Sequence, residues 1–118
     1  MAYLVMIAEE IMLQKERIEQ LNEFSAKLSY SFTDIDTLNT ALTHSSYVNG
    51  ENKARKHNER MEFLGDAVLE LCVSEYLYLN YPKMNEGLMT RTRSRAVYEP
   101  ALYQVAEQLK LGDYLLLS

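Results

Sequence analysis

Residues 58 to 70 read NERMEFLGDAVLE, a short stretch that combines four carboxylates with the apolar side chains of a protein core. A helix advances by about 100° per residue, which gathers the carboxylates into one stripe about 80° wide. This acidic stripe consists of Glu59, Glu62, Asp66 and Glu70. Apolar residues occupy nearly all the remaining directions around the helix, which predicts a helix buried within its domain or between two chains. Carboxylates there have little contact with water and need a cation or strong donors nearby.

Three hypotheses account for the acidic stripe: a solvated helix face, a set of structural salt bridges, and a site for a divalent metal. The salt bridges would use Arg60, Arg91, Arg93 or Arg95. The metal site would use Glu62 and Asp66, which lie one helical turn apart and can reach one hard cation together. Magnesium prefers one or two carboxylates completed by waters and substrate phosphates. Gly65 favours the metal hypothesis, because a glycine inside a helix costs about 1 kcal/mol and is tolerated where a backbone or ligand comes close.

Composition limits the class of protein. With 118 residues the chain has the length of one domain, and its 47% hydrophobic and 25% charged residues are those of a soluble globular protein. The chain has a single cysteine, Cys72, which cannot form an internal disulfide, and this is typical of a protein of the reducing cytoplasm. We interpret Cys72 as a small core residue rather than a reactive thiol. MAYLVMIAEE, residues 1 to 10, lacks a positive leader and is too short to span a bilayer, so neither a signal peptide nor a membrane anchor is expected.

Charge is unevenly distributed along the chain. The net charge of −5 argues against a general nucleic-acid binder, since phosphate binding is driven by Lys and Arg. Residues 8–23 carry five glutamates against two basic residues, whereas residues 81–98 carry four basic residues against Glu86 alone. The second half of the chain therefore holds a local concentration of positive charge that the average conceals.

Helical periodicity runs through most of the chain, and strand signals are scarce. Apolar spacings of three, four and seven predict a helix, or two, over residues 4–28. Asp34 and Asn85 are expected to cap two further helices. Pro82 is expected to end the acidic helix at Asn80. A last helix is expected to begin at Pro100 and to end at Gly112. Residues 43–59 have no apolar period and are expected to form mostly loop. The predicted fold class is all-α, with five or six helices.

Several motifs resemble those of one known family. NERMEFLGDAVLEL at residues 58–71 is similar to the signature of the ribonuclease III family, and ALTHSSY (41–47), EGLMTRTRS (86–94) and LKLGDYLLL (109–117) follow the order and separations of its endonuclease domain. The resemblance covers residues 21–118. Residues 1–20 are expected to be an N-terminal helical extension, either a helix that supports a dimer or a segment added for expression.

The resemblance implies a helical nuclease domain that forms a two-fold homodimer and cuts both strands of double-stranded RNA. Cleavage would leave 5′ phosphates and short 3′ overhangs and would depend on Mg²⁺, for which Mn²⁺ can substitute. Such an enzyme would process ribosomal and other RNA in the cytoplasm and have no membrane association. A metal-activated water needs no side-chain nucleophile, which fits the absence of a Ser–His–Asp or Cys–His arrangement.

The resemblance also implies roles for individual residues. Glu62 and Asp66 match the first metal-ligand pair of the family, and Glu59 and Glu86 match further carboxylates of the catalytic valley; Glu70 matches no catalytic role and is assigned to structure. His44 is assigned to structural hydrogen bonding, and Asn58 to positioning the acidic helix. The basic residues expected to meet RNA phosphates are Arg60, Lys53, Arg55, Lys56, Arg91 and Arg95. Arg93 points away from Arg91 and Arg95 at helical spacing.

The sequence departs from the family pattern near its end. The family completes its metal site with an Asp and a Glu, three residues apart, downstream of the segment that LGDYLLL resembles, and adds a double-stranded RNA-binding domain. Neither is present in these 118 residues. We therefore expect an incomplete endonuclease domain with weak or no activity of its own. The alternative is a non-catalytic dimerisation or RNA-binding module built on the same fold.

Overall fold

The computed structural model describes residues 1–48 and 56–118, and within these ranges the protein is helical. The α-helices are α1 (Ala2–Lys27), α2 (Ile35–Ala41), α3 (Glu59–Asn80), α4 (Glu86–Ala96) and α5 (Glu99–Leu109), joined by two short 3₁₀ turns, η1 (Ser45–Val48) and η2 (Leu111–Asp113). The described residues contain no strand, only one isolated bridge between Thr43 and Leu116. The predicted all-α class is confirmed.

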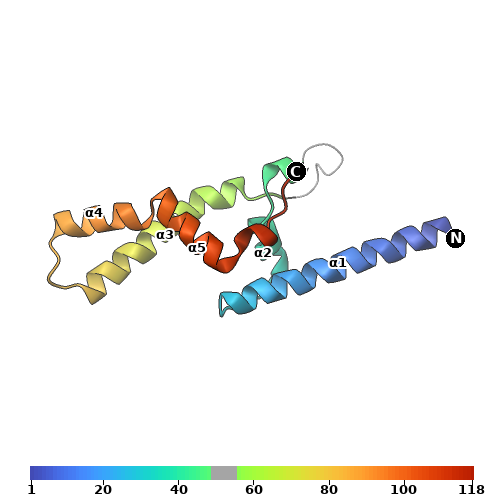
Figure 1. The fold of residues 1–118 in the computed structure, drawn as a ribbon, viewed down its shortest axis with the longest axis horizontal. Helices are drawn as coiled ribbons and strands as arrows, with labels where there is room; N and C mark the ends of the chain where they lie inside the picture. Colours follow the sequence, from blue (N-terminus) through green and yellow to red (C-terminus); the bar gives the residue numbers. More distant parts are fainter. Residues whose placement is uncertain (49–55) are drawn as a thin grey trace.

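The molecule is elongated, with extents of 70 × 28 × 23 Å. Figure 1 shows α1 projecting toward one end and the α3–α4 hairpin toward the other, with α2 and α5 between them. The predicted domain boundary after residue 20 falls inside α1, which runs unbroken across it. No helix in the described ranges combines the length and apolarity needed to cross a bilayer.

Most helix ends follow the capping chemistry expected from the sequence. The Asp34 carboxylate accepts from the Asp36 N–H at 3.0 Å, and the Asn85 side-chain oxygen accepts from the Leu88 N–H at 2.8 Å. Both caps and the end of α3 at Asn80 are confirmed. The stop predicted at Gly112 is wrong, because α5 already ends at Leu109 and Lys110 takes the left-handed conformation, with φ 53°.

The core lies where the C-terminal half of α1 meets α2 and the end of the chain. It consists of Leu21, Phe24, Leu38, Leu42 and Tyr114, with the rings of Phe24 and Tyr114 4.9 Å apart. Arg17 fixes α1 to this core, since its Nε donates to Asn39 Oδ1 at 2.7 Å and its Nη1 donates to the Tyr114 carbonyl at 2.8 Å. Burial lowers the pKa of the Arg17 guanidinium from its usual value.

The predicted burial of α3 within its own domain is wrong, while its burial between two chains stays a prediction. Only Leu77 of this helix is buried, and the whole acidic stripe is exposed. Phe63 is 83% exposed, and Cys72, expected in the core, is exposed as well. The reason is that α4 packs along one side of α3 toward its C-terminal end, so the apolar residues of the first turns have no cover among the described residues.

Candidate active site

The start of α3 is fixed by a network of backbone and side-chain hydrogen bonds. The Asn58 N–H donates to the Thr43 carbonyl at 2.9 Å, and the Asn58 side-chain amide donates to the Ala41 carbonyl at 3.0 Å. The C-terminal segment belongs to the same hydrogen-bond network, because the Leu116 N–H donates to the Leu42 carbonyl at 2.8 Å. Asn58 therefore positions the acidic helix, as predicted.

His44 belongs to the same region and has a structural role. Its Nδ1 accepts from the Ser46 N–H at 3.1 Å and lies 2.8 Å from the Ser46 hydroxyl. The Ser46 hydroxyl in turn accepts from the Ser118 N–H at 3.1 Å. The predicted structural hydrogen bonding of His44 is confirmed.

The carboxylates of the acidic stripe project from α3 without partners in the described part of the chain. No side chain in residues 1–48 or 56–118 gives Glu62 or Asp66 a hydrogen bond or ion pair. The salt-bridge hypothesis is therefore not supported, and Arg93 instead donates to the Ser74 hydroxyl at 3.0 Å. Since residues four apart on a helix are neighbours, Glu62 and Asp66 offer their oxygens to the same volume of solvent.

This pair suits a hard divalent cation but supplies only part of its shell. Carboxylate oxygens are the ligands that Mg²⁺ prefers, and one or two of them with water and phosphate oxygens make a typical site. Within the described ranges, no three His, Cys, Asp or Glu side chains come together closely enough to hold a metal ion. Glu59, one turn before Glu62 on the same exposed stripe, is near enough in sequence to assist through water.

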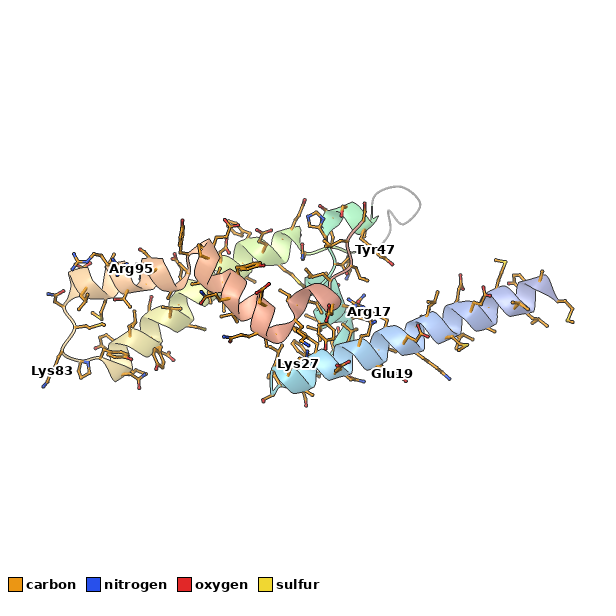
Figure 2. All side chains as sticks on the ribbon, viewed as in Figure 1. Arg17, Glu19, Lys27, Tyr47, Lys83 and Arg95 are labelled. Atoms are coloured by element: carbon orange, nitrogen blue, oxygen red, sulfur yellow. The ribbon has the colours of Figure 1, made fainter. Side chains whose placement is uncertain are left out.

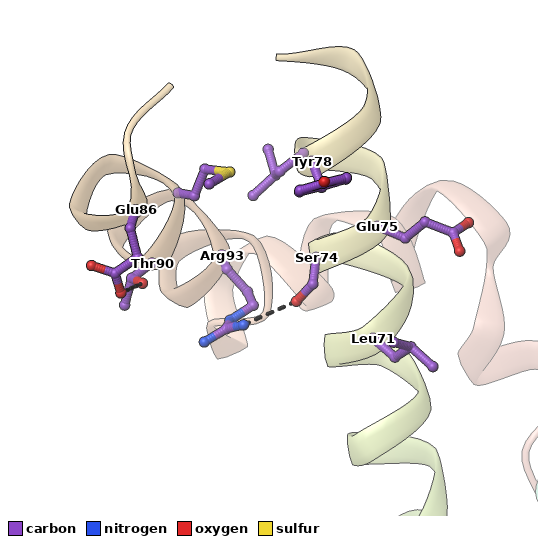
Figure 3. Close-up of a pocket in the computed structure, with 9 residues that line it drawn as sticks. Leu71, Ser74, Glu75, Tyr78, Glu86, Thr90 and Arg93 are labelled. Atoms are coloured by element: carbon purple, nitrogen blue, oxygen red, sulfur yellow. Dashed lines mark hydrogen bonds between the residues drawn. The ribbon is translucent and has the colours of Figure 1, made fainter. Parts of the chain in front are cut away.

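Glu86 lies in a separate cavity between α3 and α4, at the hairpin end of the molecule (Figure 3). The cavity has a volume of about 430 Å³ and is lined by Leu71, Ser74, Glu75, Leu77, Tyr78, Glu86, Met89, Thr90 and Arg93. The Thr90 hydroxyl donates to the Glu86 carboxylate at 3.1 Å. None of the other predicted site residues lines this cavity, so within one chain the structure does not bring Glu86 together with Glu62 and Asp66.

Sequence reasoning did not identify Ser74, Glu75 and Thr90 as the surroundings of Glu86. Which residues of α3 face which residues of α4 depends on the turn at residues 81–85, and no local pattern in either helix specifies that register. The hydrogen bond between Arg93 and Ser74 fixes it in the structure.

The basic residues divide into two groups. Lys56 and Arg60 are exposed near the start of α3, whereas Arg91 and Arg95 are exposed on α4 and Arg93 is half-buried against α3. Arg91 and Arg95 lie four residues apart on α4 and so are neighbours on the helix, whereas Arg93 points toward Ser74 of α3. Figure 2 shows Lys83 and Arg95 toward the hairpin end of the molecule. Lys53 and Arg55 lie outside the described residues.

Gly65 has open space around it. A Cβ built at this position meets no described residue within 4 Å, so packing within that part of the chain does not require a glycine. We expect Gly65→Ala to raise the free energy of unfolding by about 1 kcal/mol, because alanine loses less backbone entropy in a helix. Thermal and urea unfolding at several protein concentrations measure this. A destabilised variant would contradict the prediction and reveal a close approach at Gly65 from outside the described chain.

Known proteins resemble this chain over most of its length. A sequence profile described as Ribonuclease-III-like matches residues 34–118. Ribonuclease 3 of Clostridium kluyveri is 50% identical over 103 residues, which are 87% of this chain and 42% of that protein. Ribonuclease 3 of Oleidesulfovibrio alaskensis is 54% identical over 91 residues, 77% of this chain and 40% of that protein. The chain thus spans less than half the length of these relatives.

A solved structure agrees with the fold. The nuclease domain of ribonuclease III from Campylobacter jejuni, described with structural flexibility in a region involved in dimer formation, superposes with a TM-score of 0.72 at 42% identity. The match covers 86% of this chain and 65% of that structure. The profile match over most of the chain and the similarity of these relatives lead to one conclusion: the chain belongs to the ribonuclease-III-like family.

Proposed function

We propose that residues 21–118 form the nuclease part of a double-stranded-RNA-specific endoribonuclease, with residues 1–20 as a helical extension. The observation that carries this proposal is the pair Glu62 and Asp66, exposed side by side and without a partner among the described residues. A carboxylate pair that forms no structural contact is free to hold a cation. The family membership supports double-stranded RNA as the substrate, processed in the cytoplasm.

In this proposal Glu62 and Asp66 hold Mg²⁺, or Mn²⁺ in its place. The bound metal supplies Lewis-acid activation of the scissile phosphate and of a water nucleophile. Glu59 orients water beside the pair, while Lys56 and Arg60 bind RNA phosphates next to it; Lys53, Arg55, Arg91 and Arg95 extend the phosphate contacts along the duplex. Glu86 is a further carboxylate of the catalytic valley, contributed from the α3–α4 hairpin.

The proposed enzyme is a homodimer that uses the exposed apolar face of α3. From the second to the fourth turn of this helix, four apolar residues are at least 50% exposed: Phe63, Leu64, Val68 and Leu71. Large exposed apolar patches of this kind mark protein interfaces. A second copy covering this face would restore the burial that the amino-acid pattern predicts, and the dimer formation described for the C. jejuni nuclease domain supports the association of two copies.

Cleavage of long duplex RNA by the chain tests the proposed function. We expect slow cleavage in Mg²⁺ or Mn²⁺, with 5′-phosphate ends, and none after chelation with EDTA. The low rate is expected because the described residues provide only a partial metal shell. Gel electrophoresis of end-labelled duplex measures both the products and the binding.

The second candidate function is a non-catalytic dimerisation or RNA-binding module. The absence, in the described ranges, of any group of three metal-binding side chains favours it. A chain that shifts duplex RNA in a gel but releases no fragment in either metal would establish the module and contradict the nuclease.

A further inference from the structure

The N-terminal half of α1 stands away from the body of the molecule (Figure 1). Leu21 and Phe24, in the C-terminal half, are 2% and 4% exposed in the core. Arg17 and Lys27 hold this half in place, since Arg17 bonds Asn39 and Tyr114, and Lys27 Nζ donates to the Leu109 carbonyl at 3.3 Å. By contrast, every residue of α1 before Arg17 is exposed.

The apolar stripe of α1 nevertheless continues into this free half. Leu4, Ile7, Ile11 and Ile18 are 66%, 37%, 48% and 46% exposed. With Gln14 they repeat at alternating spacings of three and four residues, the a and d positions of a coiled coil, and Leu21 continues the same register into the core. A helix of this length in water depends mainly on packing of its apolar stripe, and within residues 1–48 and 56–118 nothing buries the stripe of the free half.

We propose that residues 4–18 of α1 form a parallel two-stranded coiled coil with the same segment of a second copy. Leu21, at the next d position, is already buried in its own chain, so the pairing ends near Ile18. The two bodies then lie at the same end of the coil. This surface is distinct from α3, and the inference goes beyond the proposed nuclease function.

The polar residues of the segment favour the parallel orientation. Parallel pairing sets Gln14 against Gln14 of the second copy, where the two amides can bond each other, while antiparallel pairing sets Gln14 against an apolar residue, Leu4 or Ile11. In the parallel coil Glu10 at position g also faces Lys15 at position e of the partner helix, an attractive pair made twice by symmetry. The polarity of Gln14 therefore favours the parallel orientation, and the Glu10–Lys15 pair supports a second copy of this helix as the partner.

Sedimentation of the full chain with substitutions on and off the stripe tests the pairing. All variants are made in a chain that also carries Phe63→Asp, which removes association through α3. In this chain the double substitution Ile7→Asp/Ile11→Asp should raise the dissociation constant of the α1 pair by about tenfold or more. The reason is that two charged residues replace buried ones in each helix. Val5→Asp with Met12→Asp is the matched control, since these residues are also exposed and apolar but lie on another face. Equal association of both variants with the Phe63→Asp chain overturns the proposal.

Cross-linking separates the orientation of the helices from any loss of helix in the charged variants. With Cys72 changed to Ser, Leu4→Cys should form a disulfide-linked dimer under mild oxidation, because the two copies of residue 4 meet in a parallel coil. Glu9→Cys, on the outer face, should not. No dimer at position 4, or equally fast dimer formation at position 9, contradicts the parallel coil. Cleavage by the Ile7→Asp/Ile11→Asp chain should be unchanged, so a failure of the nuclease assay remains a separate result.

Discussion

Glu62→Gln and Asp66→Asn are each expected to weaken Mn²⁺ binding by at least about tenfold and duplex-RNA cleavage by at least about 100-fold. Losing a residue that only orients a metal ligand costs about 10–100-fold in affinity or activity, and losing the ligand itself should cost at least as much. Each substitution keeps the size of the side chain and removes its negative charge. Paramagnetic resonance of free Mn²⁺ measures binding, and end-labelled duplex measures cleavage.

Asp66→Asn should slightly gain stability, whereas Glu62→Gln should stay close to the unmodified chain, because the charge of Glu62 in the first turn of α3 is also favoured by the helix N-terminus by about 0.3–1 kcal/mol. Like charges four residues apart on a helix destabilise it by about 0.2–0.5 kcal/mol, and Glu62 and Asp66 form such a pair without a compensating partner in the described residues. Lost activity with undiminished stability distinguishes a functional pair from a structural one. Urea unfolding provides the measurement.

Glu70→Gln is the matched control for the metal pair. Glu70 lies on the same exposed stripe, one turn beyond Asp66, and the substitution removes the same charge. Its carboxylate has no assigned role, so metal binding and cleavage should remain at the level of the unmodified chain. An equal effect at all three positions would show that the stripe acts only through its total charge, and the metal-pair proposal would then be wrong.

The helical framework was predictable because its signals are local. Asp34 caps the amide of Asp36, Asn85 caps that of Leu88, and Pro82 comes just after the C-cap Tyr81 of α3, so a few neighbouring residues specify each boundary. The left-handed Lys110 was not predictable in the same way, since a lysine carries no preference for positive φ while the nearby Gly112 does.

Most features that could not be predicted from the sequence are contacts between residues far apart in the chain. The apolar content of α3 indicates that something covers this helix but does not say which surface does so. The bond between Asn58 and Ala41 spans 17 residues, and that between Arg17 and Tyr114 spans 97. Such bonds depend on how the helices meet, so periodicity and capping rules cannot locate them. For the same reason Glu86 was placed in the site by resemblance, while the structure puts it in a cavity of its own.

Asn58→Asp is expected to lower the free energy of unfolding by about 0.5–1.5 kcal/mol, because it replaces the amide that donates to the Ala41 carbonyl with an acceptor and so loses this exposed hydrogen bond. The start of α3 would then be less firmly held against the end of α2. Since Glu59 and Glu62 lie in the first turn of this helix, the Mg²⁺ concentration for half-maximal cleavage should rise as well.

Asn85→Asp is the control that isolates the donor. Both asparagines occupy the position before a helix, and both substitutions place a negative charge at a helix N-terminus, which is favourable by about 0.3–1 kcal/mol. Asn85, however, accepts from the Leu88 N–H, and a carboxylate accepts equally well. The Asn85→Asp variant should therefore unfold at or above the temperature of the unmodified chain, while Asn58→Asp unfolds below it. Equal shifts at the two positions would mean that the bond from Asn58 to the Ala41 carbonyl contributes nothing to stability, and the role of Asn58 in orienting the acidic helix toward α2 would have to be abandoned.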